Sequence, residues 1–334
     1  MIIDDLTLET ELSRTPFRQI YLATKKGSSM KYMAQIIDKQ SNSSELAKKY
    51  LDNEISIVKD ITHPNIAKLI DIIETEKYRC IVTEYCNGGS LENYLLKHQL
   101  ENENGLSEEI VQYIMRQIIN VMKYLYNKKI MHRDLKPENF LIQYEDENDR
   151  KNNNILKGTI KLIDCGFAKI LKKGEYTKTA LGSPLYMSPL LLQKFKCQDK
   201  TIKDKVYDYE EDIWSLGILC YKLLIGKSPF DAENMDELVV KMEKGEYFMP
   251  FTLSKETITF INSMLQYESK NRLSYDELKN HKFLKKTVNE FSKIEFNGVK
   301  NIATENDFQI LFNTKSNESV KIFAKVDFKK LFNE

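Results

Sequence analysis

The sequence predicts an α+β fold in which a small β-rich lobe is followed by a larger, mainly helical lobe. Near the N-terminus, IYLAT (20–24) and KYMAQIID (31–38) resemble strands separated by turn residues. After NGG (87–89) the pattern changes, and apolar residues recur every three or four positions in EEIVQYIMRQIINVMKYLY (108–126). A strand-rich segment followed by a helical one therefore predicts two structurally distinct lobes.

The remaining elements follow from local signals. Ser43 and Ser44 are possible N-caps for one helix in the small lobe, in which apolar residues recur at roughly helical spacing. RCIVTEYC (79–86) is predicted as a further buried strand. Ser107 is expected to cap the long helix, whose first turn is acidic. YEDENDRKNNN (144–154) is polar throughout and is predicted as a solvated loop without a chemical role.

Composition narrows the classes of partner and compartment. The chain has 334 residues, 42% of them hydrophobic, which is enough for a sizeable core. With 50 basic and 49 acidic residues, the net charge gives no argument for binding nucleic acid or an acidic membrane surface. The five cysteines are odd in number and lack metal-ligand spacing, which favours free thiols in a reducing compartment. We therefore expect a cytoplasmic protein without a membrane span, since no apolar run reaches about 20 residues.

The strongest functional signal is MHRDLKPEN (131–139), followed by IDCG (163–166). These segments resemble the catalytic loop and the metal-binding motif of eukaryotic protein kinases of the serine/threonine type. The resemblance implies the bilobal protein-kinase fold, with ATP and Mg²⁺ as cofactors. It also implies that Asp134 accepts the proton of the substrate hydroxyl, that Lys136 steadies the moving phosphate, and that Asn139 and Asp164 hold magnesium.

Other segments extend the resemblance over about 280 residues. YEEDIWSLG (209–217) is similar to the central helix of the large lobe, whose aspartate, here Asp212, anchors the backbone of the catalytic loop. IVTEYC resembles the hinge, which makes Thr83 the gatekeeper and implies that backbone groups near Glu84 and Cys86 bind adenine. The segment GSPLYMSP is most similar to that of the autophagy-initiating and Fused-like kinases.

These landmarks suggest three parts: an N-lobe with its hinge (1–86), a C-lobe (87–284) and a C-terminal extension (285–334). The extension is predicted to dock on the kinase body or on a partner protein, because it is too rich in aromatic residues for a typical disordered tail. A flexible tail is the alternative. The phenylalanines of the C-terminal extension are Phe291, Phe296, Phe308, Phe312, Phe323, Phe328 and Phe332.

The nucleotide-binding segments depart from the family pattern in two places. The three glycines of the lid fall on Ser13, Thr15 and Arg18, which predicts a stiffer lid and weaker ATP binding. The strand lysine is replaced by Gln35, so that Glu54, the matching helix glutamate, lacks its usual cation. In the with-no-lysine kinases the cation stands at the third glycine position of the lid. Arg18 occupies that position, and it is either the relocated cation or a solvated strand residue.

Two further departures concern the activation segment. Leu190 stands where the family has the glutamate that pairs with the arginine matched by Arg272. Either another carboxylate serves Arg272, or the substrate-docking loop is held less firmly. Cys165 replaces the phenylalanine of the metal motif and leaves a gap in the packing between the lobes.

The pattern favours a serine/threonine kinase of atypical, weak activity that acts on a protein substrate or a regulated partner protein. The alternative is a pseudokinase that serves as a binding or scaffold module. Phosphorylation at Thr179, with Thr177 as the alternative site, is expected to regulate the protein through Arg133, which precedes the catalytic aspartate.

Overall fold

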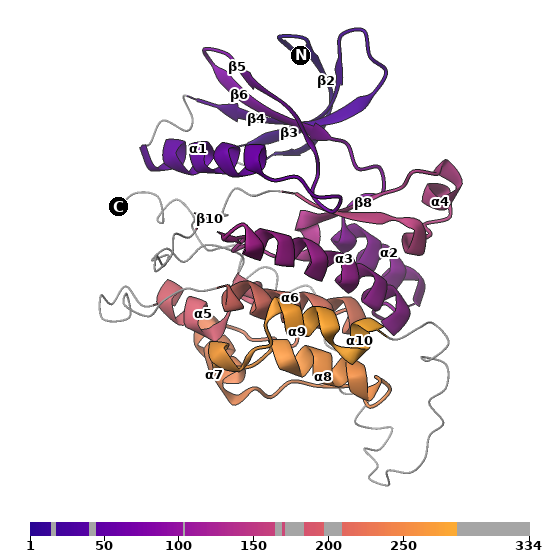
Figure 1. The fold of residues 1–334 in the computed structure, drawn as a ribbon, viewed down its shortest axis with the longest axis vertical. Coiled ribbons are helices and arrows are strands. Elements are labelled where there is room, and N and C mark those ends of the chain that lie inside the picture. The colour runs from indigo at the N-terminus through magenta and orange to yellow at the C-terminus, as the bar shows by residue number, and fades with distance from the viewer. Residues whose placement is uncertain are drawn as a thin grey trace.

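The computed structural model describes residues 1–14, 18–39, 45–102, 104–163, 169–170, 184–196 and 209–285. A sheet and one helix form the upper part of Figure 1, and a larger body of helices lies beneath them. The predicted α+β architecture of two lobes is confirmed. The N-cap predicted at Ser43 or Ser44 and all but the first residue of the C-terminal extension lie outside the described residues.

The small lobe is one antiparallel sheet in the strand order β1-β2-β3-β4-β6-β5, with one helix beside it. Alternate side chains of these strands form an apolar cluster that includes Leu6, Ala23, Ala34, Ile36 and Val82. The elements are β1 (Ile2–Ile3), β2 (Leu6–Arg14), β3 (Gln19–Lys25), β4 (Lys31–Asp38), α1 (Glu45–Asp60), β5 (Leu69–Glu74) and β6 (Tyr78–Glu84).

Helices dominate the large lobe, and α6 is buried along nearly its whole length. The rings of Trp214 and Phe230 stack in its core with centroids 5.7 Å apart. The helices are α2 (Leu91–Asn102), α3 (Glu108–Asn127), α4 (Glu147–Lys151), α5 (Pro189–Lys196), α6 (Glu210–Ile225), α7 (Met235–Lys244), α8 (Lys255–Met264), α9 (Tyr275–Asn280) and α10 (Lys282–Lys285). Two small sheets pair β7 (Ile130–Met131) with β10 (Lys169–Ile170), and β8 (Phe140–Gln143) with β9 (Thr159–Leu162).

The sequence patterns predict the long helix α3 correctly but do not predict the short helix α4. Ser107 caps α3 as predicted, because its side chain accepts a hydrogen bond from the amide of Ile110. The segment predicted as a loop at 144–154 contains the five-residue helix α4. Asp146 caps this helix by accepting bonds from two backbone amides, and the helix buries none of its residues. A short helix without an apolar face gives no periodicity, so the composition alone suggested a loop.

The lobes are joined through the strand that leads to the metal-binding motif. The amide of Leu162 donates to the carbonyl of Asn65 at 2.8 Å, and the amide of Ala67 donates to the carbonyl of Leu162 at 2.9 Å. The next amide, that of Ile163, donates to the carbonyl of Asn139 at 2.9 Å. Consecutive residues of this strand are therefore bonded to the small lobe and to the catalytic loop.

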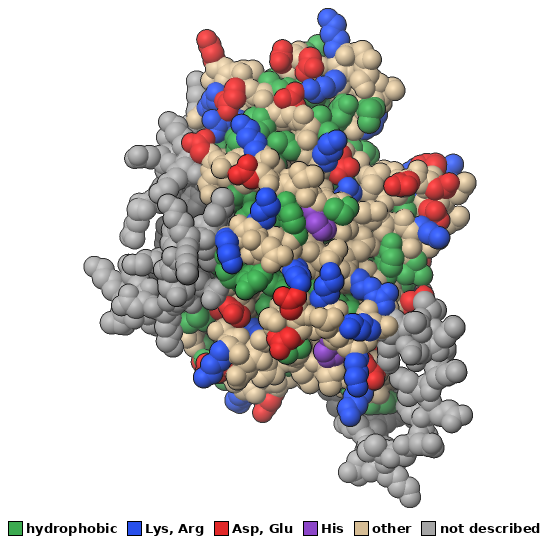
Figure 2. Space-filling view, in the orientation of Figure 1, with side chains coloured by type: hydrophobic (Ala, Val, Ile, Leu, Met, Phe, Trp, Pro, Cys, Tyr) green, Lys and Arg blue, Asp and Glu red, His purple; other side chains and the backbone are tan. Residues whose placement is uncertain are grey.

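The described surface carries charge of both signs. Blue and red side chains occur together from the small lobe to the base of the large lobe on the face seen in Figure 2, as the balanced composition leads one to expect. Among the helices of the described residues, none has the length and apolar character needed to cross a membrane.

Candidate active site

The catalytic loop brings three predicted site residues into contact. The ammonium Nζ of Lys136 lies 2.9 Å from Oδ2 of Asp134. The side-chain amide nitrogen of Asn139 donates to the carbonyl of Asp134 at 2.7 Å and to its Oδ2 at 3.2 Å. Asp134 and Asn139 are buried within this network. The arrangement fixes a carboxylate beside a cation, as a reaction that deprotonates a hydroxyl and moves a phosphate requires.

Helix α6 holds the backbone of this loop. The carboxylate of Asp212 accepts hydrogen bonds from the amides of His132 and Arg133, both at 2.8 Å. Burial raises the pKa of Asp212, while the charge of His132 and the two amide bonds oppose that shift. Arg133 has a φ of 71°, a left-handed conformation that costs energy in a residue with a side chain. The two bonds to Asp212 compensate that strain, which agrees with its expected anchoring role.

Arg18 lies against the side chains of Glu54 and Gln35. Its Nη2 is 2.6 Å from Oε2 of Glu54, and its Nη1 is 3.0 Å from both Oε1 of Glu54 and Oε1 of Gln35. The Glu54 side chain is only 2% exposed, whereas that of Arg18 is 24% exposed. Two parallel N–H···O bonds to one carboxylate are the strongest geometry that arginine offers. Glu54 therefore has a cation, although the strand position that usually provides it carries Gln35.

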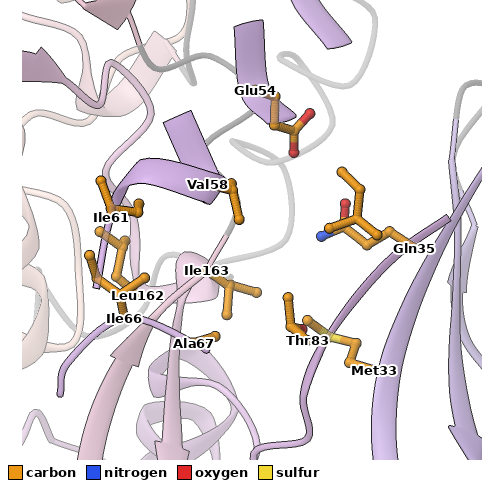
Figure 3. Close-up of a pocket in the computed structure, with 11 residues that line it drawn as sticks. Met33, Gln35, Glu54, Val58, Ile61, Ile66, Ala67, Thr83, Leu162 and Ile163 are labelled. Atoms are coloured by element: carbon orange, nitrogen blue, oxygen red, sulfur yellow. The ribbon is translucent and has the colours of Figure 1, made fainter. Parts of the chain in front are cut away.

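A small pocket lies directly behind these groups. Figure 3 shows Glu54 of α1 and Gln35 of β4 above a lining that includes Met33, Thr83 and Leu162. The strand register pairs Met33 with Thr83 and Gln35 with Ile81, so Gln35 lies two residues along β4 from the partner of Thr83. Apart from Gln35, Glu54 and Thr83 the lining is apolar. The position of Thr83 at this pocket agrees with a gatekeeper role.

Residues 8–284 match the family described as protein kinase domain. The chain belongs to this family. The match covers most of the described residues, and the catalytic loop, the helix α6 that anchors it and the two lobes are all in the arrangement that the motifs imply.

The curated relatives of this kinase domain include several serine/threonine kinases. The chain is 35% identical over 260 residues to serine/threonine-protein kinase ULK1 of Homo sapiens, covering 76% of this chain and 23% of that protein. It is 30% identical over 304 residues to serine/threonine-protein kinase atg1 of Dictyostelium discoideum, covering 87% and 41%. Maternal embryonic leucine zipper kinase of Xenopus laevis is 34% identical over 271 residues, with 80% and 37% covered. The chain thus spans less than half the length of each, and the first two agree with the resemblance to autophagy-initiating kinases.

The hinge of the kinase domain follows β6. Glu84 accepts bonds from the amide of Lys68 and from the ammonium of Lys161, both at 2.8 Å, so its side chain points toward β9. Its backbone remains part of the strand, with the amide bonded to the carbonyl of Lys68. Cys86 is buried two residues later, at the turn into the large lobe. The adenine contacts expected near Glu84 and Cys86 stay a prediction.

The donor set of the catalytic loop fits magnesium. Because the amide nitrogen of Asn139 donates to Asp134, its carbonyl oxygen is directed elsewhere. A neutral oxygen next to carboxylates is the kind of ligand that Mg²⁺ prefers. The second predicted ligand, Asp164, lies outside the described residues, as do Cys165, Thr177 and Thr179.

The sequence left open which carboxylate serves Arg272, and the structure places Glu211 beside it. Nη1 of Arg272 is 3.5 Å from Oε2 of Glu211, and both side chains are almost fully buried. Burial raises the pKa of Glu211, while the charge of Arg272 opposes the shift. Glu211 directly precedes Asp212, and an acidic residue next to a helix position that is expected to be buried was the signal that could have identified it.

The buried cysteines of this kinase domain are expected to be inert while it is folded. Burial raises the pKa of Cys80 to about 11 and that of Cys86 to about 12, and it also raises that of Cys220. At pH 8 only about one Cys86 in 10,000 would be a thiolate. Alkylation by iodoacetamide, followed residue by residue by mass spectrometry, should be at least about 100-fold slower than in urea-unfolded protein. Modification of Cys86 at the rate of a free thiol in the folded protein would contradict this prediction.

Proposed function

We propose that this chain is a serine/threonine protein kinase that transfers the γ-phosphate of ATP to hydroxyl groups of a protein substrate. The observation that carries the proposal is the contact of Arg18 with Glu54, made at 2.6 and 3.0 Å in a domain that retains the catalytic-loop residues. A cation at this place supplies the positive charge that the replacement of the strand lysine by Gln35 removes. The buried free thiols support a cytoplasmic location.

The roles of the side chains follow from their contacts. Asp134 accepts the proton of the attacking hydroxyl, and Lys136, 2.9 Å from it, supports the phosphate as it moves. Asn139 and Asp164 would hold magnesium, which neutralises the negative charge of the triphosphate when it is bound. Arg18 would supply positive charge for the phosphates, and Glu54 fixes its guanidinium through two hydrogen bonds. The backbone near Glu84 and Cys86 would bind adenine.

Turnover of ATP by the purified chain tests the proposal against the pseudokinase alternative. We expect magnesium-dependent binding of ATP and phosphorylation of a generic serine/threonine substrate, both lost in Asp164→Asn. The substitution keeps the size of the side chain and removes the charge that would bind the metal. Binding without turnover in every phosphorylation state of the parent would favour the pseudokinase. In that case the Arg18–Glu54 contact would serve the stability of the small lobe.

Phosphorylation of the activation segment is proposed to switch the kinase on. Thr179, or alternatively Thr177, would carry a phosphate with about −1.5 to −2 charges at neutral pH, to which the guanidinium of Arg133 is a suitable partner. We expect Thr179→Ala to lower turnover about tenfold and Thr179→Glu to retain part of it. The measurement is the rate of substrate phosphorylation after treatment with phosphatase or an activating kinase. Equal rates in parent and both variants would exclude Thr179 and leave Thr177 to be tested in the same way.

A further inference from the structure

The segment that follows the activation loop is bound to helix α6 at several points. It begins with a single 3₁₀ turn (Pro184–Tyr186) and continues into α5. The hydroxyl of Ser215 donates to the carbonyl of Tyr186 at 2.8 Å. Ser188 is fully buried, and its hydroxyl accepts the amide of Leu191 at 3.2 Å, which caps α5. The nearby hydroxyl of Ser188 also lowers the pKa of Glu211, so this carboxylate lies close to the start of α5.

The buried positive charge of Arg272 needs a negatively charged partner near the start of α6. Its guanidinium is fully buried and donates to the backbone carbonyls of Gln266, Glu210 and Tyr267 at 2.9, 2.7 and 3.3 Å. These carbonyls accept from three of its five N–H groups but do not neutralise its charge. Within the described residues, the carboxylate that forms an ion pair with it is that of Glu211. Burial lowers the pKa of Arg272, and the charge of Glu211 opposes this shift.

In the family pattern the carboxylate stands at position 190, on the segment itself, where this chain has the half-buried Leu190. We propose that Glu211 carries this relocated carboxylate and is a positioning residue for the protein substrate. The proposal rests on the proposed kinase function. By pairing with Arg272 and contacting Ser188, Glu211 fixes residues 184–196, on which the substrate peptide would lie. Neighbouring acids on one turn of α6 thus hold both loops of the active site, since Asp212 holds the catalytic loop.

The test compares the parent with Glu211→Ala, Glu211→Gln and the double variant Glu211→Ala/Leu190→Glu. In Glu211→Ala we expect the KM for a peptide substrate to rise about tenfold. The KM for ATP should stay unchanged, because the partner of Glu211 in the described part of the chain, Arg272, is not assigned to nucleotide binding. Hydrogen exchange of the Leu191 and Leu192 amides, which bond to Ser188, should become about tenfold faster. Moving the carboxylate back to position 190 should restore both values.

Controls separate this role from general destabilisation and from the absence of kinase activity. Glu246→Ala removes an exposed acid from the same lobe and should change neither value. If Glu211→Ala fails to fold, Glu211→Gln carries the test, because it keeps the volume and removes the charge. If the parent shows no turnover, hydrogen exchange of the Leu191 and Leu192 amides in the Glu211 variants still tests the positioning role of Glu211. Three results would overturn the proposal. The first is a folded Glu211 variant in which the peptide KM and the hydrogen-exchange rates are unchanged. The others are equal rises in the KM for peptide and for ATP, and a folded double variant in which neither the peptide KM nor the exchange rates return to the parent values.

Discussion

Replacing Arg18 by alanine is expected to lower kcat/KM for ATP about thirtyfold, equivalent to about 2 kcal/mol of transition-state stabilisation. The substitution removes the guanidinium that donates hydrogen bonds to both carboxylate oxygens of Glu54. The buried carboxylate of Glu54 would then face the phosphates. Unlike charges 4 Å apart are worth roughly 4 kcal/mol at an effective dielectric constant of 20, so both the lost attraction and the added repulsion act against the reaction. Steady-state turnover at varied ATP concentration measures the effect.

A second substitution tests whether Arg18 replaces the cation that is missing from the strand position of Gln35 or is an additional cation. Gln35→Lys in the Arg18→Ala background should restore much of the turnover, because it returns an ammonium to the strand opposite Glu54. In the parent background the same change puts two cations on one carboxylate and should bring no gain. Arg14→Ala is the matched control, since Arg14 is exposed and its ion pair with Glu11 lies within β2 at the surface. Equal turnover by parent and Arg18→Ala would remove Arg18 from the mechanism.

Asp212→Ala should lower the free energy of unfolding by about 3 kcal/mol or more. It leaves the buried amides of His132 and Arg133 without acceptors, and each unsatisfied group costs about 1–3 kcal/mol. The left-handed backbone at Arg133 then lacks the contacts that compensate its strain. The shift of the urea midpoint at constant m-value is the measurement.

Asp212→Asn provides the graded comparison, because its single amide oxygen can still accept from one of the two N–H groups. Its loss of stability should be about half as large. Asp231→Ala, a change of an exposed aspartate in the same lobe, should have little effect. A loss below about 1 kcal/mol for Asp212→Ala would mean that the loop keeps its conformation without this anchor.

Most of the fold and the catalytic loop could be predicted because they depend on contiguous residues. Alternation and helical spacing identify strands and helices locally, and the residues from His132 to Asn139 act within one short loop. Contacts between distant segments could not be predicted in the same way. That Arg18 reaches Glu54 depends on the pairing of Ile20 with Gln35 and on the packing of α1 beside the sheet, which no local pattern specifies.

The partner of Arg272, Glu211, is a second example of a contact that could not be predicted from local sequence patterns. The sequence showed that position 190 lacks a carboxylate but not where a replacement stands. The two positions are 21 residues apart in the chain, so no local pattern links them. The short helix α4 was missed for a different reason, since its stability comes from the cap at Asp146 and not from a buried face.

The bonds made by Leu162 and Ile163 locate the axis of lobe motion. Leu162 exchanges backbone bonds with Asn65 and Ala67 of the upper lobe, while the adjoining amide is attached to Asn139 below. A rigid rotation of the lobes that preserves these bonds must turn about this strand, where displacements are smallest. We therefore expect the two lobes to open and close about this strand while the spacing between Asn139 and Ile163 hardly changes. Opening of the lobes would then leave the catalytic loop and the strand that precedes the metal-binding motif in the same relative position.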